Sequence, residues 1–458
     1  MEAMIQRADD RAPRRTARAW KGRPLLAPSR ETLALFVVAL ALRVAYAWLV
    51  HGPAPVPSSD SVTYDTVGWN LARGMGFSLM GGTAPYPTAF VPPALPWALS
   101  LLYRSTGHSF FAAVMLMCVF GALVPPLLRQ LGRAMFGPAV GSWAGWLAAF
   151  HPLLIFFSGY VMTESLFSVT LLVALLTSVA WIKQPGGGRA FWSGVLWGAA
   201  SLTRPTALPL ALIIGLWGWR PLGLALAPRE RGRQLLLLLL GLALCVAPWT
   251  LRNAASMHAF VPLTTGGGRS LLDSNNPVVW DDDARRGGAI AVLTTEPWAT
   301  RFRGLSEVEL DRRAGREAVE FLRAHVAAWP RAALAKFARY WRWTALTPST
   351  GTWSSESAGL ASRLQRLDPL LPWSIVFFPL AVWGLARTLR GTRRHFQLLP
   401  LWVIATSTLG TLVYWGALRL RVPIEPLVTL YAAAGVADIA WRVRMRRAGL
   451  TLVSSQRG

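Results

Sequence analysis

The sequence predicts an all-α membrane protein that crosses the bilayer several times, on three observations. Of its 458 residues, 53% are hydrophobic and only 15% are charged, well below the roughly 25% charged residues of soluble domains. Apolar runs of about 18 or more residues recur along most of the chain, which is the pattern of membrane-spanning helices. Basic residues lie mainly in the short segments between these runs. We therefore expect about ten transmembrane helices with helical loops.

The net charge of +25 comes from 47 Lys plus Arg against 22 Asp plus Glu. In a soluble protein this excess would suggest nucleic acid, but basic segments between apolar runs are typical of cytoplasmic loops. We expect the lipid bilayer, and no nucleic acid, as a partner. Cys118 and Cys245 both lie inside apolar runs, where we expect small buried hydrophobes and no disulfide.

Each predicted span follows from one apolar run. The spans cover residues 32–50, 109–128, 138–158, 165–182, 190–203, 206–221, 234–250, 371–389, 397–417 and 423–441. The fifth and sixth spans are short and meet at the stretch "LTRPT". Every loop that this count places in the cytoplasm is basic, so both termini are expected inside.

These spans divide the chain into five parts. A basic tail, 1–31, precedes an uncleaved first span, and a second basic tail covers 442–458. Between the tails lie an N-terminal transmembrane region, a long outer loop and a C-terminal transmembrane region. They cover 32–250, 251–370 and 371–441, and a first outer loop of 51–108 lies within the N-terminal region.

The loop 251–370 is expected to hold two amphipathic helices near the outer membrane surface. Ser306 with Glu309 three residues later is a capping-box pattern. The apolar residues after it recur at helical spacing. Pro330 either ends this helix or begins the next one.

Charged residues are concentrated where the chain reaches the outer face. Charge near the bilayer is costly, about 2.5–3.5 kcal/mol at a helix centre, and tends to mark a functional site. The residues in question are Asp60, Asp65, Glu164, Arg204, Arg252, Arg419, Arg421 and Glu425. Three histidines nearby are not spaced as a metal set, so the sequence specifies no metal ligand.

Local structure offers a simpler explanation for three of these acids and for the arginines. In "SSDSVTYDTVGWNLARG", Ser58, Ser59 or Asp60 could cap a helix that ends before Gly74. Asp65 would then favour the helix N-terminus electrostatically. Glu164 could lie in a first helical turn capped by Thr163. The arginines could extend to the interface without a further role.

Carboxylates and arginines together on one face suit sugar transfer from a lipid phosphate. A carboxylate can act as a general base towards an acceptor hydroxyl. Arginine matches a phosphate leaving group in bidentate geometry and stabilises the charge that grows on it.

Seven short motifs in order resemble a known family. They are "SDSVTYDTVGWNLARGMGFS", "YPTAFVPPALPWALSLLY", "HPLLIFFSGYVMTESLF", "LTRPTALPLAL", "PWTLRN", "GGRSLLDSNNP" and "LRLRVPIEPLVTLYAA". Over residues 32–435 the layout is similar to the polyprenyl-phosphate-dependent glycosyltransferases of the C-type membrane fold. It most resembles bacterial members of the dolichyl-phosphate-mannose–protein mannosyltransferase superfamily, which includes the lipid A aminoarabinose transferases.

The resemblance implies a sugar donor carried on a polyprenyl phosphate and inversion at the anomeric carbon. It implies Asp60 as the catalytic base and Glu164 as a second acid that positions the acceptor or a metal. In some relatives a divalent metal contributes; no other cofactor is implied. Two departures stand out: Ser61 replaces a glutamate, and Val91 replaces a basic residue before a proline pair.

We therefore predict Arg252 and Arg269 as donor-phosphate ligands, with Arg204 and Arg421 as helpers. The substrate-lining residues predicted beside them are Tyr64, Asp65, Asn275 and Asn276. Tyr64 lies one helical turn after Asp60 and would share its face.

The predicted function is a bacterial inner-membrane glycosyltransferase with a periplasmic active site. It would transfer a sugar from the lipid donor to a hydroxyl of a lipid, glycan or protein acceptor. The alternative is a transporter or flippase of lipid-linked sugars, although the chain shows neither clear repeated halves nor clear midplane charge. A non-catalytic assembly protein with the same fold is the third reading.

Overall fold

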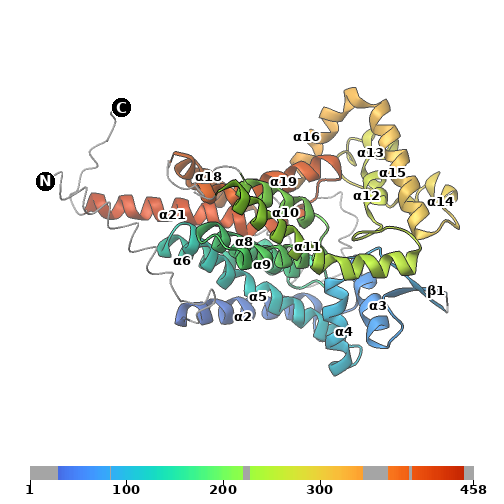
Figure 1. The fold of residues 1–458 in the computed structure, drawn as a ribbon, viewed down its shortest axis with the longest axis horizontal. Helices are drawn as coiled ribbons and strands as arrows, with labels where there is room; N and C mark the ends of the chain where they lie inside the picture. Colours follow the sequence, from blue (N-terminus) through green and yellow to red (C-terminus); the bar gives the residue numbers. More distant parts are fainter. Residues whose placement is uncertain (1–28, 83, 220–226, 344–369, 391–394, 448–458) are drawn as a thin grey trace.

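The computed structural model describes residues 29–82, 84–219, 227–343, 370–390 and 395–447 (Figure 1). Most of the predicted basic tails and the stretch 344–369 of the long loop lie outside the described residues. The described chain is largely helical, with long helices that run side by side at one end and shorter elements at the other. We call the latter the loop end; it contains residues 52–108 and 258–343.

Seven segments of the described chain are long and apolar enough to cross a membrane, which confirms a multi-pass membrane protein. Four of them are single helices: α2 (Arg30–His51), α5 (Phe110–Met135), α8 (Thr163–Lys183) and α11 (Pro228–Met257). The fifth is α18 (Leu370–Arg390). The sixth joins η3 (His395–Leu398) to α19 (Leu399–Val413), and the seventh joins α20 (Leu418–Arg421), η4 (Val422–Ile424) and α21 (Glu425–Arg447).

Shorter helices occupy the positions of the other three predicted spans. They are α6 (Pro138–Ala149) with α7 (Pro152–Phe157), α9 (Gly187–Thr203) and α10 (Ala207–Trp219). α6 and α7 are separate because Pro152 disfavours the helical conformation of the residue before it, and His151 is extended at φ −65° and ψ 116°. The count of ten spans therefore stays a prediction.

The first loop contains two helices and a small hairpin. α3 (Asp60–Ala72) and α4 (Ala94–Thr106) flank β1 (Ser78–Gly81) and β2 (Ala84–Pro87), which pair antiparallel with Ser78 opposite Pro87. The hairpin is the one departure from an all-helical architecture in the described residues. α3 ends as predicted, with Arg73 as C-cap and Gly74 at φ 78°.

The second loop packs short helices against one amphipathic pair. Its elements are α12 (Gly267–Ser274), α13 (Pro277–Trp280), η1 (Val292–Thr294), α14 (Trp298–Arg301), α15 (Glu307–Ala324), η2 (Val326–Ala328) and α16 (Trp329–Tyr340). Ser306 caps α15 as predicted, since its hydroxyl accepts from the Glu309 amide at 3.3 Å. Pro330 lies in the first turn of α16, so it begins the second helix.

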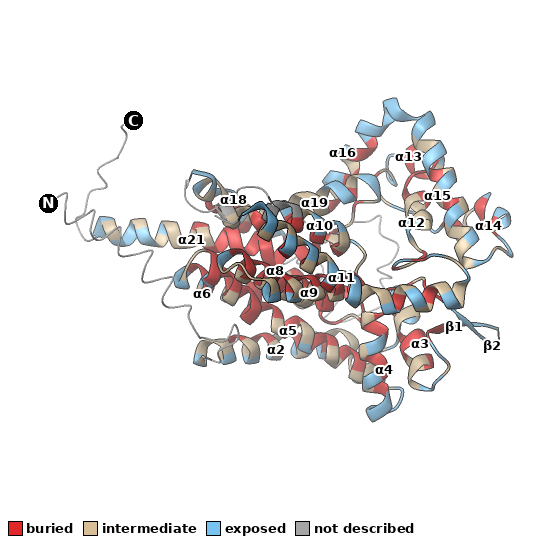
Figure 2. Cartoon of the chain, in the orientation of Figure 1, coloured by how far each residue is buried: buried red, intermediate tan, exposed pale blue. Residues whose placement is uncertain are grey.

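The main apolar core lies in the middle of the helical bundle, where buried residues concentrate along α5, α8 and α9 (Figure 2). Some neighbouring helices cross at glycine, where backbones touch. A Cβ on Gly194 of α9 would lie 1.9 Å from the Leu238 carbonyl oxygen of α11. A Cβ on Gly384 of α18 would lie 1.9 Å from the Tyr431 carbonyl oxygen of α21. Only a glycine permits these approaches.

Gly194→Ala is expected to destabilise the bundle by about 1–3 kcal/mol, because the added methyl overpacks a backbone contact. Thermal unfolding of the detergent-solubilised protein would show the loss. Gly188→Ala in the same helix is the control, since a Cβ there meets nothing within 4 Å. Equal unfolding temperatures for the two variants would contradict this prediction.

Candidate active site

Four charged side chains from four elements meet at the loop end of the bundle. Arg419 of α20 binds Asp60 of α3 through its Nη2, 2.5 Å from Oδ2. Its Nε lies 3.5 Å from Oε1 of Glu164 in α8. Arg204, which follows α9, donates from Nη2 to the same Glu164 oxygen at 2.9 Å. These four residues, the four-charge cluster, join positions up to 359 residues apart in sequence.

Local sequence sets the helix position of three members of the cluster. Glu164 lies in the first turn of α8, where a carboxylate is favoured by the helix dipole. Arg204 precedes Pro205, which disfavours helical backbone, and its φ of −147° and ψ of 127° end α9 there. Asp60 is the first residue of α3.

The local explanations for Asp60 and Glu164 are only partly confirmed. The N-cap of α3 is Ser59, one of the three candidates, but it makes no side-chain cap hydrogen bond. The Asp60 carboxylate is instead directed at Arg419. The N-cap of α8 is Met162, so Thr163 does not cap that helix, although Glu164 does lie in its first turn. Both acids are therefore placed by tertiary contacts.

The two carboxylates have opposite environments. The Glu164 side chain is 1% exposed, and its Oε2 has no hydrogen-bond partner in the described structure. The Asp60 side chain is 49% exposed. Asp60 is therefore the carboxylate that an incoming molecule can reach, and Glu164 holds the two arginines from within.

Tyr64 lies beside the cluster, as its position one turn after Asp60 predicts. Burial raises the pKa of its hydroxyl to about 12, and the neighbouring charge of Glu164 adds to the shift. Tyr64 therefore stays a neutral phenol at physiological pH. It can donate a hydrogen bond to a ligand, but it is a poor base.

Asp65 is directed away from the cluster. Its carboxylate accepts from the Tyr103 hydroxyl at 2.5 Å and lies 2.9 Å from Nε2 of His108. The His108 ring stacks on Trp69 with 4.8 Å between centroids. The predicted helix-terminus role is wrong, because Asp65 lies beyond the first turn of α3. It links α3 to α4 and to the start of α5.

Arg252 binds backbone carbonyls of the first loop. Its guanidinium donates to the carbonyls of Phe77 and Thr88, each at 2.6 Å. It also lies over the ring of Trp249, 5.0 Å from the centroid. These contacts hold the hairpin against α11, and the structure does not join Arg252 to the four-charge cluster.

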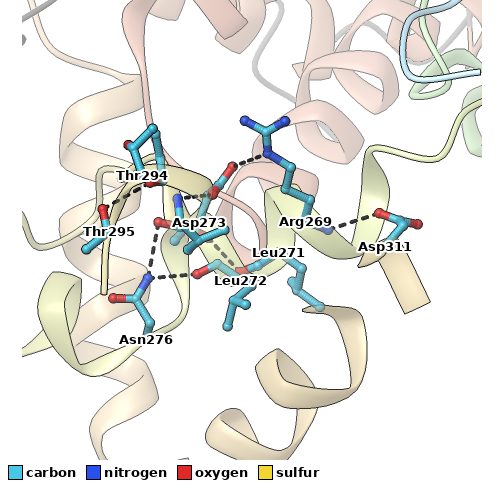
Figure 3. A network of polar contacts seen from close by, with 11 residues as sticks. Arg269, Leu271, Leu272, Asp273, Asn276, Thr294, Thr295 and Asp311 are labelled. Atoms are coloured by element: carbon cyan, nitrogen blue, oxygen red, sulfur yellow. Dashed lines mark hydrogen bonds and ion pairs between the residues drawn. The ribbon is translucent and has the colours of Figure 1, made fainter. Parts of the chain in front are cut away.

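Arg269 retains donors that a ligand could use. Its backbone amide donates to Asp311 at 3.0 Å, and its Nε lies 3.8 Å from Oδ2 of Asp273. The two terminal nitrogens point away from Asp273 (Figure 3). The guanidinium also lies 5.0 Å from the Phe90 ring centroid. Its role as a phosphate ligand stays a prediction.

The remaining predicted residues are buried. The Arg421 side chain pairs with Glu425 and donates to the carbonyls of Tyr340 and Arg342 at 3.1 and 2.8 Å. Asn275 and Asn276 are both 0% exposed. The Asn276 oxygen caps α13 by accepting from the Val279 amide at 3.0 Å. The structure does not bring these three side chains to the cluster.

Sequence reasoning placed Arg419 among the outer-face charges but did not select it as a site residue, although it bridges both acids. The motif "LRLR" places it two positions before Arg421. Residues two apart on a helix point in different directions, so at most one of this pair could face the cluster. The two-residue spacing could be seen in the sequence, but it did not indicate which of the two arginines faces the cluster.

The described residues contain no group of three or more His, Cys, Asp or Glu side chains placed to hold a metal ion. In the cluster, the guanidinium of Arg419 lies between Asp60 and Glu164. The two predicted acids are thus joined by a cationic side chain.

The architecture is that of the C-type membrane glycosyltransferases. The chain is similar to the archaeal oligosaccharyltransferase AglB from Archaeoglobus fulgidus. The AglB structure is a complex with an inhibitory peptide and a dolichol-phosphate. The TM-score is 0.55 at 14% identity, over 93% of this chain and 52% of AglB. A crystal structure of the Archaeoglobus fulgidus oligosaccharyltransferase with zinc and sulfate gives a TM-score of 0.56 at 13% identity, over 92% of this chain and 50% of that one. The chain therefore spans about half the length of AglB.

The resemblance seen in the motifs is confirmed by a family model. Residues 91–250 match the model described as dolichyl-phosphate-mannose-protein mannosyltransferase. ArnT from Cupriavidus metallidurans, bound to undecaprenyl phosphate, aligns over 92% of this chain and 81% of its own at 15% identity. Its TM-score of 0.43 is too low to establish a common fold. No curated protein sequence matches the chain.

Asp273→Asn is expected to remove a pH dependence of stability. Burial raises the pKa of Asp273 to about 6, so the folded state binds its proton more tightly than the unfolded state. The ionised group costs on the order of 2–3 kcal/mol above pH 6, and this cost disappears as the pH falls towards 4.

The difference in unfolding free energy, variant minus wild type, should therefore rise between about pH 4 and 6 and stay level above about 7. Denaturant unfolding at several pH values measures it. A difference that does not change with pH would contradict the prediction.

Proposed function

We propose that this protein is a membrane glycosyltransferase that moves a sugar from a polyprenyl-phosphate donor to a hydroxyl acceptor. The observation that carries the proposal is the four-charge cluster, which places an accessible carboxylate beside two arginines at one end of a C-type bundle. The family match over 91–250 supports it. AglB, similar in fold, is seen with dolichol-phosphate, a polyprenyl-phosphate-type lipid.

Each member of the cluster has a role in this reaction. Asp60 accepts the proton of the acceptor hydroxyl as the acceptor oxygen bonds to the anomeric carbon. The bond from that carbon to the phosphate oxygen breaks, and its electron pair leaves on the lipid phosphate. Arg419 and Arg204 stabilise this growing charge. Glu164 orients both arginines.

The ion pair between Arg419 and Asp60 suits this sequence of events. A donor phosphate offers Arg419 two oxygens in place of one carboxylate contact. Once Arg419 turns to the phosphate, the Asp60 carboxylate is released from its contact with Arg419 and is free to accept a hydrogen bond from the acceptor hydroxyl. Donor binding would thus prepare the base for the acceptor. Arg269, with its terminal nitrogens directed away from Asp273, is a further candidate for the phosphate.

Charge distribution supports a periplasmic site in a bacterial inner membrane, with both termini in the cytoplasm. Basic residues such as Arg133, Lys183 and Arg387 lie in or beside the turns opposite the loop end. Short basic loops favour the cytoplasmic side. The loop end, with the cluster, then faces the periplasm.

Asp60→Asn should abolish sugar transfer, lowering kcat by about 10²–10⁴-fold because a general base is lost. The assay uses purified protein, a panel of polyprenyl-phosphate sugars and mass detection of the product. Asp283→Asn is the control, since Asp283 is 78% exposed on the second loop. Full activity of Asp60→Asn would exclude Asp60 as the base, and an inactive wild type with every donor would count against the proposed function.

Arg419→Gln should lower kcat by about 10²–10³-fold, the usual cost of removing one donor that stabilises transition-state charge. Arg421→Gln tests the neighbouring arginine, whose donors are bound to Glu425 and two carbonyls. We expect Arg421→Gln to lower stability much more than Arg419→Gln does. A larger loss of kcat per folded molecule from Arg421→Gln would reverse this assignment.

A further inference from the structure

The short link that carries Arg419 is fixed by the second loop. α19 ends at Val413, and residues 414–417 connect it to α20, which begins one residue before Arg419. Trp415 of this link lies beneath the Arg419 guanidinium, 5.8 Å from the ring centroid. Any displacement of the link therefore moves Arg419 relative to Asp60 and Glu164.

Two fully buried side chains bind the last residue of α19. Lys336 of α16 donates from Nζ to the Val413 carbonyl at 3.0 Å. Asn275 donates to the same carbonyl at 3.0 Å, and its own oxygen accepts from Lys336 at 2.7 Å. Both residues are 0% exposed. A cation at a helix C-terminus satisfies carbonyls that the helix leaves free.

Two further contacts hold the link on either side. The Ser274 hydroxyl donates to the Tyr414 carbonyl. The Gly416 amide donates to the Gly287 carbonyl at 2.9 Å. A Cβ on Gly416 would lie 2.0 Å from the Lys336 carbonyl oxygen, so the link lies directly on the backbone of α16. Elements of the second loop thus fix both ends of the link.

Burial of the Lys336 ammonium group costs desolvation free energy that a purely structural contact would not require. No carboxylate of the described residues lies within ion-pair distance of Lys336, and burial lowers its pKa to about 8. An apolar residue of similar length would avoid that desolvation cost. A buried polar network of this kind specifies one geometry, since each donor must meet its acceptor.

We propose that Lys336 and Asn275 are positioning residues that set the place of Arg419, and with it the phosphate-binding geometry of the cluster. The proposal rests on the proposed function, because it acts through an arginine assigned to the donor phosphate. It makes the second loop part of the donor site, although neither side chain touches the four-charge cluster. Their effect on a ligand passes through residues 413–419.

The test is a double-mutant cycle on ligand binding. Undecaprenyl phosphate is the probe, titrated against the full-length protein in lipid nanodiscs, with undecaprenol as the control without phosphate. The variants are Lys336→Met, Arg419→Gln and the double variant. Arg331→Met is the matched control, since Arg331 lies on the same helix but is exposed and contacts Asp283 at 3.1 Å.

We expect Lys336→Met and Arg419→Gln each to raise the Kd for undecaprenyl phosphate about tenfold or more. The double variant should bind no more weakly than Arg419→Gln alone, because Lys336 acts through Arg419. Arg331→Met should bind like the wild type. Binding of undecaprenol should not depend on any of these changes.

The outcomes separate the two proposals. If the wild type binds undecaprenyl phosphate no better than undecaprenol, or if Arg419→Gln binds like the wild type, the role of Arg419 in the proposed function fails. If Arg419→Gln weakens binding but the losses add in the double variant, the positioning proposal fails and Lys336 is merely structural.

Ser274→Ala provides a second route if Lys336→Met does not fold. It removes the hydrogen bonds that the Ser274 hydroxyl donates to the Tyr414 and Leu271 carbonyls and accepts from Asn275, but it leaves the bonds of Lys336 and Asn275 to Val413 in place. A smaller rise in Kd, about two- to threefold, is therefore expected, and it should disappear in the Arg419→Gln background. A Kd equal to that of the wild type would overturn the proposal.

Discussion

The double contact of Arg419 with Asp60 and Glu164 is the interaction on which the loop end depends. Glu164 is 1% exposed, and an unpaired charge at such a site would cost several kcal/mol. Arg419 and Arg204 neutralise it from two directions. Because the partners come from α3, α8, α20 and the end of α9, pairing the charges also joins the first loop to the helical bundle.

Charged side chains also hold the loops together further from the cluster. Glu307 of α15 accepts from the Thr88 hydroxyl at 2.7 Å and the Ala89 amide at 2.9 Å, and also from the Thr265 hydroxyl. Arg252 donates to the carbonyls of Phe77 and Thr88, which flank the hairpin. Glu307 therefore joins the second loop to the first, and Arg252 joins the first loop to α11. Contacts of this kind can hold a polar ligand in a defined orientation.

A site of this kind distributes its tasks between exposed and buried charges. Asp60 is half-exposed and can meet an acceptor, whereas Glu164 is enclosed and directs the arginines. Tyr64 adds a neutral donor to the same surface. The fold shared with AglB supplies the frame, but the arrangement of these side chains is what supports transfer chemistry rather than transport. The four-charge cluster lies at the loop end of the bundle, where a lipid headgroup would reach it.

Much of the candidate site could be predicted because its members are unusual in their surroundings. Asp60, Glu164 and Arg204 are charged residues at the ends of apolar runs, and the structure brings all three together. Arg252 and Asn276 looked equally suitable by sequence, yet their donors and acceptors are used by backbone groups nearby. The sequence shows that a side chain is polar. It does not show whether the hydrogen-bonding groups of that side chain are already bonded to the backbone.

The sequence by itself determined the membrane-spanning helices, the helix after Asp60 and the cap at Ser306, because these depend on hydropathy and on neighbours within a few residues. Only the tertiary structure decided which of Arg419 and Arg421 enters the cluster. The two residues are both arginines of the motif "LRLR" and lie two positions apart on one short helix. Their partners, Asp60 and Glu164 for one and Glu425 for the other, are chosen by how distant helices pack. No local pattern carries that information.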